Sequence, residues 1–169
     1  MKYKILIVAL TLLLVFSLSE AIAQITRIMP LGDSLTVGAG QITDNNYRVS
    51  YRQSLWLNLA GGGYSVDFVG SQTSGLSAIP DFDASHEGHG GYTASQVAGN
   101  VYSWLQGNPA DIVLLHIGTN DIGNGTGIDV PTLIGRIENI LNAIDDFESD
   151  YSTEITVVLA QIIDQKIHS

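Results

Sequence analysis

Residues 25–36 read ITRIMPLGDSLT, an apolar run that ends in a glycine, an acid and a serine. Ile25 to Leu31 is predicted to be a short buried strand, in which Pro30 is tolerated because it lies near the end. Ser34 then falls just past the carboxyl end of this strand, where open α/β sheets place their ligand sites. Its hydroxyl is a candidate nucleophile, provided that a base activates it. Alternatively, Ser34 is an ordinary helix N-cap or turn residue.

Beyond this stretch, apolar segments alternate with helical patterns, which predicts parallel βαβ units. Predicted strands cover residues 25–31, 64–70, 111–118 and 154–163, and predicted helices cover 47–60, 93–106 and 131–147. Residues 112–115 read IVLL, without polar alternation, so this strand is predicted to be central with both faces buried. Residues 71–91 are predicted to form a long loop, which a compact domain seldom keeps without a use.

The N-terminus is predicted to be a signal peptide rather than part of the fold. Lys2 and Lys4 precede an apolar run over residues 5–18, and Ala21-Ile22-Ala23 has the small-x-small form of a cleavage site. An uncleaved membrane anchor is the alternative, but the run is short for a span. We therefore expect residues 1–23 to be removed and residues 24–169 to form one secreted or periplasmic domain.

The composition limits the partners and the chemistry. Seventeen acidic residues against seven basic ones leave a formal charge of −10, which should repel nucleic acid and anionic membranes. The sequence has no cysteine, which excludes disulfides, thiol redox chemistry and thiolate metal sites. The fold must therefore depend on a packed core.

Three polar segments with glycines follow predicted elements: residues 32–34, 90–92 and 118–121. In a parallel sheet such segments share one edge. Acyl transfer needs this kind of set, because donors must surround the carbonyl oxygen that becomes negative when a nucleophile attacks. Gly91 can present its N–H without a Cβ in the way, and the Asn120 side chain supplies a neutral amide donor. Taken singly, each of these residues is also common in plain turns.

Together, these segments resemble the first three sequence blocks of the SGNH, or GDSL, hydrolase superfamily. The matching residues are Gly32-Asp33-Ser34-Leu35, Gly91 before Tyr92, and Gly118-Thr119-Asn120-Asp121. Three further segments are most similar to the branch with carbohydrate esterase family three, the secreted acetylxylan esterases: residues 51–56 (YRQSLW), 66–71 (VDFVGS) and 86–92 (HEGHGGY). The resemblance implies a three-layer α/β/α sandwich with a parallel, flavodoxin-like sheet. The chain has no Gly-x-Ser-x-Gly elbow, so the α/β-hydrolase fold is not expected.

The resemblance also implies roles for individual residues. Ser34 would be the nucleophile, and the oxyanion hole would comprise the Ser34 N–H, the Gly91 N–H and the Asn120 side chain. Asp33 and Asp121 would hold their loops by hydrogen bonds. The substrate would be an acylated carbohydrate or another small ester, with acetyl as the acyl group, and neither a metal nor an organic cofactor would be needed.

One part of the family pattern is missing, namely the late Asp-x-x-His block that supplies the catalytic histidine. Asp164 and His168 are the late pair here, with one residue more between them, and they are weak candidates for acid and base. We therefore expect a domain truncated at its C-terminus, with an uncovered last strand and marginal stability. Two alternatives to a polysaccharide deacetylase remain open: a non-catalytic carbohydrate-binding module or inactive fragment, and a lipase or thioesterase of the same superfamily.

The other histidines have competing interpretations. His86 and His89 are expected to shape the loop beside Gly91, with metal binding or a displaced catalytic base as alternatives. His116 lies on the predicted central strand and is expected to be a satisfied core histidine.

Overall fold

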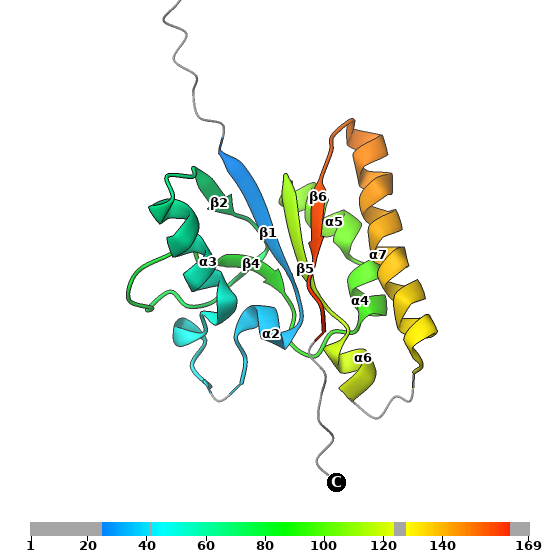
Figure 1. Ribbon diagram of the computed structural model, residues 1–169, viewed down its shortest axis with the longest axis horizontal. Helices are drawn as coiled ribbons and strands as arrows, with labels where there is room; N and C mark the ends of the chain where they lie inside the picture. The colour runs from blue at the N-terminus through cyan, green and yellow to red at the C-terminus, as the bar shows by residue number, and fades with distance from the viewer. Residues whose placement is uncertain (1–24, 41, 124–127, 163–169) are drawn as a thin grey trace, which may run out of the picture.

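The computed structural model describes residues 25–40, 42–123 and 128–162 (Figure 1). The predicted signal peptide and the pair Asp164 and His168 lie outside these residues. Within the described ranges, no helix is long and apolar enough to cross a membrane.

The centre of the fold is a largely parallel sheet built around the strand that precedes Ser34 (Figure 1). The strands are β1 Thr26–Gly32, β2 Val66–Phe68, β3 Gln72–Thr73, β4 Ser85–Gly88, β5 Ile112–His116 and β6 Thr156–Leu159. Their order is β3-β4-β1-β5-β6, and β2 pairs with the first half of β1, on the side where β4 pairs with its end. All these pairs are parallel except β3 with β4.

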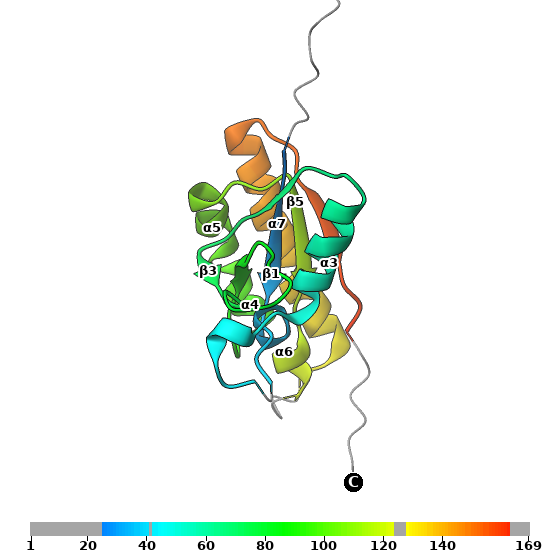
Figure 2. The ribbon, with the colours of Figure 1, turned by 90° about the vertical axis from the view of Figure 1, so that its left-hand side faces the viewer.

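Helices flank the sheet on both sides, which confirms the predicted α/β/α class (Figures 1 and 2). They are α2 Ser34–Val37, α3 Ser50–Gly61, α4 Ala94–Ala98, α5 Val101–Gly107, α6 Thr119–Gly123 and α7 Val130–Tyr151, with a 3-10 turn, η1, over Asn45–Tyr47. The helix α7 begins where the Asp129 carboxylate accepts a hydrogen bond from the Thr132 N–H, with Pro131 in the first turn. In Figure 1, α4, α5 and α7 lie on one side of the sheet and α3 on the other.

The main core lies between the sheet and the layer of α4, α5 and α7. Its fully buried side chains include Met29, Leu31, Val113, Leu115, Val97, Val101, Leu105, Ile140 and Ile144. Burial alternates along β5, so Leu114 on the opposite face is only half-buried. In β6, Val158 and Leu159 are about half exposed, at 51% and 49%. The prediction of a central strand is therefore correct, whereas the prediction that both its faces are buried is wrong.

Two segments differ from the prediction. The predicted helix over residues 93–106 is divided at Gly99 and Asn100 into α4 and α5. The predicted long loop over residues 71–91 contains β3 and β4, and β4 pairs with the end of β1. The sequence Ser-His-Glu-Gly of β4 has no apolar signal because its histidine and glutamate are buried by internal hydrogen bonds rather than by hydrophobicity.

Candidate active site

Ser34 is the first residue of α2, directly beyond β1, and Asp33 rather than Ser34 is the N-cap. The buried Asp33 carboxylate accepts a hydrogen bond of 2.9 Å from the Leu35 N–H, and its carbonyl accepts bonds from Thr36 and Val37. The interpretation of Ser34 as a helix cap is therefore wrong. Its hydroxyl is left free of a capping role.

Asn120 joins the three polar segments. Its Nδ2 donates a hydrogen bond of 2.8 Å to the carbonyl of Tyr92, the residue after Gly91. The same nitrogen lies 3.4 Å from Oδ2 of Asp33, the residue before Ser34. The ends of β1, β4 and β5 thus meet, as the parallel sheet predicts.

Asp121 ties the third segment to the helices behind it. Its carboxylate is fully buried, accepts a hydrogen bond of 2.8 Å from the Ala94 N–H at the start of α4, and forms an ion pair of 2.7 Å with Arg136 of α7. Asp33 and Asp121 therefore each hold a backbone segment by a hydrogen bond.

Burial raises the pKa of Asp33, and the nearby Asp121 carboxylate adds to this effect. The hydrogen bond from the Leu35 N–H and the proximity of His116 act in the opposite direction. The carboxylate is therefore kept in place by a backbone donor rather than by a direct ion pair.

Several polar groups at this edge make no internal hydrogen bond within the described part of the chain. They are the Ser34 N–H and hydroxyl and the Gly91 N–H. Gly91 has a φ of +82°, and a Cβ built there would meet no heavy atom within 4 Å. Gly91 is thus exposed, with open space beside its Cα, and its backbone is accessible to a ligand.

Comparison with known proteins identifies the family. The family 3 carbohydrate esterase of Clostridium thermocellum superposes with a TM-score of 0.58 at 30% sequence identity, over 83% of this chain and 82% of that one. The chain therefore belongs to carbohydrate esterase family 3. No family model matches it.

Other known proteins share part of the sequence or the fold. A multidomain esterase of Ruminococcus flavefaciens is 34% identical over 119 residues, which span 59% of this chain and 15% of that protein. The fold is also that of AlinE4, an SGNH-hydrolase family esterase, with a TM-score of 0.54 at 18% identity over 81% of this chain and 60% of that one. Membership of family 3 therefore rests on the Clostridium thermocellum protein, and the likeness to AlinE4 shows a shared fold.

A serine hydroxyl needs a base to act as a nucleophile, and His86 has no free nitrogen to act as one. Its Nδ1 accepts a hydrogen bond of 2.9 Å from the Gly88 N–H, so its proton is on Nε2. This Nε2 donates to the Ser74 hydroxyl at 2.9 Å, because that hydroxyl in turn donates to the Val37 carbonyl. Burial, with the nearby Arg52, lowers the pKa of His86 to about 3, so the ring is neutral.

The imidazole of His89 is also held by contacts inside the fold. Its Nε2 lies 2.6 Å from the fully buried carboxylate of Glu87, which accepts two further hydrogen bonds from Ser71. The imidazole is stacked on both Tyr92 and Trp104, with centroid distances of 4.8 and 4.4 Å. Both histidines therefore shape the segment beside Gly91. No histidine among the described residues is hydrogen-bonded to the Ser34 hydroxyl.

His116 differs from its prediction. It lies at the end of β5 opposite Gly32 in the sheet register, and its Nε2 is buried with no hydrogen-bond partner among the residues that the structure describes. The expectation of a satisfied core histidine is wrong, because the neighbouring lining of Leu114, Val158 and Tyr51 is mostly apolar.

A metal is not supported as the role of the histidines. Within residues 25–40, 42–123 and 128–162, no group of three or more histidine, cysteine, aspartate or glutamate side chains is arranged to hold an ion. The glutamate near His89 accepts hydrogen bonds from Ser71 instead.

Arg52 was not among the predicted site residues. It is fully buried on α3 and donates hydrogen bonds to the carbonyls of Thr36 and Val37, at the end of the short helix that begins with Ser34. It also donates to Ser74, which contacts His86. Its sequence signal was its place in the segment 51–56 that resembles the family, without any indication of what Arg52 does.

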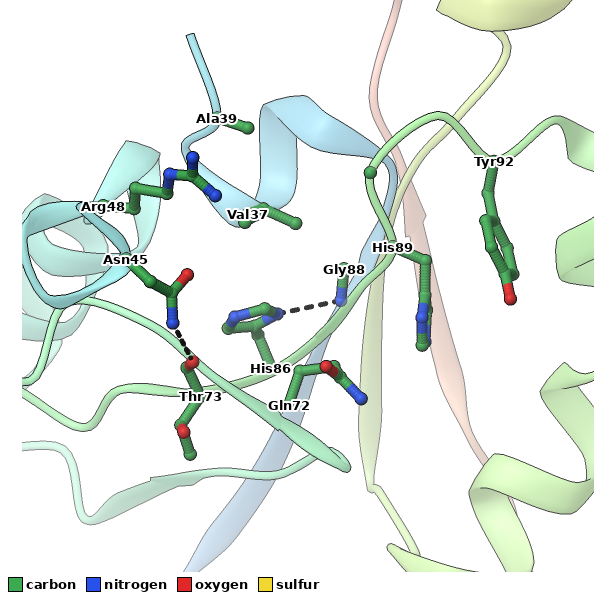
Figure 3. A pocket seen from close by; sticks show the side chains of 11 residues that line it. Val37, Ala39, Asn45, Arg48, Gln72, Thr73, His86, Gly88, His89 and Tyr92 are labelled. Carbon is green, nitrogen blue, oxygen red and sulfur yellow. Dashed lines mark hydrogen bonds between the residues drawn. The ribbon is translucent and has the colours of Figure 1, made fainter. Parts of the chain in front are cut away.

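A pocket of about 320 Å³ opens beside the candidate site (Figure 3). It is bounded by the end of α2, the η1 turn, β3 and the segment from Gly88 to Tyr92 that contains Gly91. The pocket extends from the segment with the predicted oxyanion donor toward Asn45 and Arg48.

Proposed function

We propose that this family 3 protein is a serine esterase that removes acetyl groups from polysaccharide, with Ser34 as the nucleophile. The observation that carries the proposal is the position of the Asn120 amide, bonded to the carbonyl after Gly91 and 3.4 Å from the carboxylate before Ser34. Relatives described as carbohydrate esterases support the class of substrate.

In the proposed reaction, Ser34 Oγ attacks the ester carbonyl carbon and transfers its proton to a base. The carbonyl oxygen becomes negative and accepts hydrogen bonds from the Ser34 N–H, the Gly91 N–H and the Asn120 amide. These donors suit the role because the two backbone N–H groups have no internal partner in the described part of the chain. The short bond to Tyr92 fixes the amide, while its second N–H makes only a long bond of 3.4 Å to Asp33, which it would exchange for a bond to the oxyanion.

The tetrahedral intermediate then expels the sugar hydroxyl, which takes the proton from the base, and Ser34 keeps the acetyl group. Water, deprotonated by the same base, attacks this acetyl-serine and releases acetate. The candidates for the base and its acidic partner are His168 and Asp164, which lie outside the described residues.

The experiment is hydrolysis of 4-nitrophenyl acetate and of acetylated xylan by the chain and by its Ser34→Ala and Asn120→Ala variants. We expect Ser34→Ala to lose the rate above background, and Asn120→Ala to lose about 100-fold in kcat, as for other oxyanion donors. Equal rates for wild type and Ser34→Ala would exclude Ser34 as the nucleophile.

The same experiment distinguishes two other functions. Binding of xylan without Ser34-dependent hydrolysis would instead indicate a non-catalytic carbohydrate-binding module. Faster hydrolysis of long-chain esters than of acetyl esters would indicate the second function, that of a lipase or thioesterase.

We further propose that the protein is exported after removal of residues 1–23, on the pattern of Lys2, Lys4 and Ala21-Ile22-Ala23. Mass spectrometry of the exported protein should show an N-terminus at Gln24. An intact N-terminus in a membrane fraction would indicate an uncleaved anchor.

A further inference from the structure

The pocket of about 320 Å³ beside Gly91 has an unusual charge for this chain (Figure 3). The protein carries a formal charge of −10, yet none of the described residues that line the pocket has a carboxylate. The neighbouring Glu87 is fully buried and accepts hydrogen bonds from Ser71 and His89. Arg48 is the arginine in the lining, His86 is neutral, and His89 is bonded to Glu87.

The other described arginines already have partners. Arg27 forms an ion pair with Asp111 and Arg136 with Asp121, at 3.1 and 2.7 Å. Arg52 is fully buried and donates to backbone carbonyls. Arg48 makes no ion pair with any described residue.

Hydrogen bonds hold Arg48 in place while leaving part of its guanidinium free. Its Nε donates to the Ile42 carbonyl at 2.8 Å and its Nη2 to the Thr43 carbonyl at 3.0 Å. These bonds occupy the Nε–Nη2 edge, so the edge between Nη1 and Nη2 remains. This edge has the fork geometry that binds a carboxylate through two parallel bonds, and a held side chain loses little entropy on binding.

The rest of the lining suits the hydroxyl groups of a sugar. Nδ2 of Asn45 donates to the Thr73 carbonyl, which leaves its amide oxygen free to accept. Nε2 of Gln72 donates to the Ser71 hydroxyl, which leaves its amide oxygen free in the same way. The pocket thus combines neutral acceptors with the Arg48 guanidinium.

We propose that this pocket binds the carboxylate of a uronic acid carried by the polysaccharide, with Arg48 as the residue that recognises it. The inference rests on the proposed function, because the pocket would hold the sugar next to the one whose ester reaches Ser34. It makes the preferred substrate an acidic rather than a neutral acetylated glycan.

The test is calorimetric binding of two probes to the Ser34→Ala chain: xylotetraose, and xylotetraose with one glucuronic acid substituent. We expect the acidic probe to bind about tenfold more tightly, as for a bond to a charged group, with the preference declining as salt increases. Adding Arg48→Gln should abolish the preference. Arg27→Gln is the matched control. It removes the same charge at the start of β1, at the end of that strand opposite to Ser34, and should leave the preference unchanged.

Arg48→Lys guards against misfolding of the Arg48→Gln chain, since it keeps the charge and loses the fork. We expect the preference of the Arg48→Lys chain for the acidic probe to lie between those of the wild-type residue and of Arg48→Gln. The proposal is overturned if both probes bind equally, if neither binds, or if both Arg48 variants keep the full preference. If the acidic probe shows no preference but Ser34-dependent hydrolysis is measured, this inference is wrong and the proposed function is supported. If the preference is measured but no Ser34-dependent hydrolysis is found, the proposed function is wrong and recognition of the carboxylate by Arg48 is supported.

Discussion

Replacing Arg52 by methionine tests how the helix that carries Ser34 is held. Arg52 is fully buried, and its guanidinium donates to the carbonyls of Thr36, Ser74 and Ala84 at 2.9 to 3.3 Å. Its Cζ also lies 5.6 Å from the centre of the Phe82 ring. Burial lowers the pKa of Arg52 to about 10, so the side chain is still charged at neutral pH.

Methionine fills similar space but cannot donate, so three buried carbonyls lose partners that water cannot readily replace. Each such group costs about 1–3 kcal/mol, and relaxation of the loops recovers part of this. We expect a loss of about 3–5 kcal/mol in the free energy of unfolding, as for other broken buried charge networks. For a domain of this size the melting temperature should fall by about 10 °C.

The assay is thermal and urea unfolding of the chain and its variants, followed by circular dichroism. Arg27→Met is the matched control, because its ion pair with Asp111 is 41% and 31% exposed and should contribute less than about 1 kcal/mol. Arg52→Lys keeps a charge but loses the planar fork, and should be destabilised nearly as much as Arg52→Met. A loss below about 1 kcal/mol for Arg52→Met would refute the reasoning.

Three further predictions concern stability. Gly70→Ala should destabilise by at least about 2 kcal/mol, because its φ is +153° and its Cβ would lie 2.2 Å from the His86 carbonyl carbon. Gly91→Ala should cost only about 1 kcal/mol, since its φ of +82° has the backbone penalty without a clash; equal losses in urea unfolding would contradict this. Because the pKa of His86 is about 3 in the fold and near 6.5 when unfolded, its stabilising effect is complete above pH 6.5 and declines as the pH falls toward 3. Urea unfolding between pH 5 and 7 should show this decline, and a His86→Gln variant with the same slope would rule it out. Val158→Thr and Leu159→Thr should change stability by about 0.5 kcal/mol or less and reduce self-association in light scattering, because both side chains are half exposed; a large loss of stability would mean that they are covered.

The sequence predicted the elements whose burial depends on apolar side chains. The strand before Ser34, the central strand over Ile112–His116 and the helix starting at Pro131 all have hydrophobic patterns that identify them. It did not predict β4 over Ser85–Gly88, because that strand is buried through hydrogen bonds to residues distant in the chain. A local pattern contains no signal of such partners.

The amino-acid sequence by itself determined the α/β class and the three polar segments after the strands, because strand ends and glycine turns are local properties. Only the tertiary structure decided what the polar side chains do. It assigns Asp33 as the helix cap, joins Asn120 to Tyr92, and occupies both nitrogens of His86. The bonds of Asn120 to Tyr92 and of His86 to Ser74 join residues 28 and 12 positions apart, and hydrogen-bond geometry over such separations is set by packing rather than by spacing in the chain. The cap on Asp33 and the bond from Gly88 to His86 are local, but which side chain makes them depends on the backbone conformation of the folded chain.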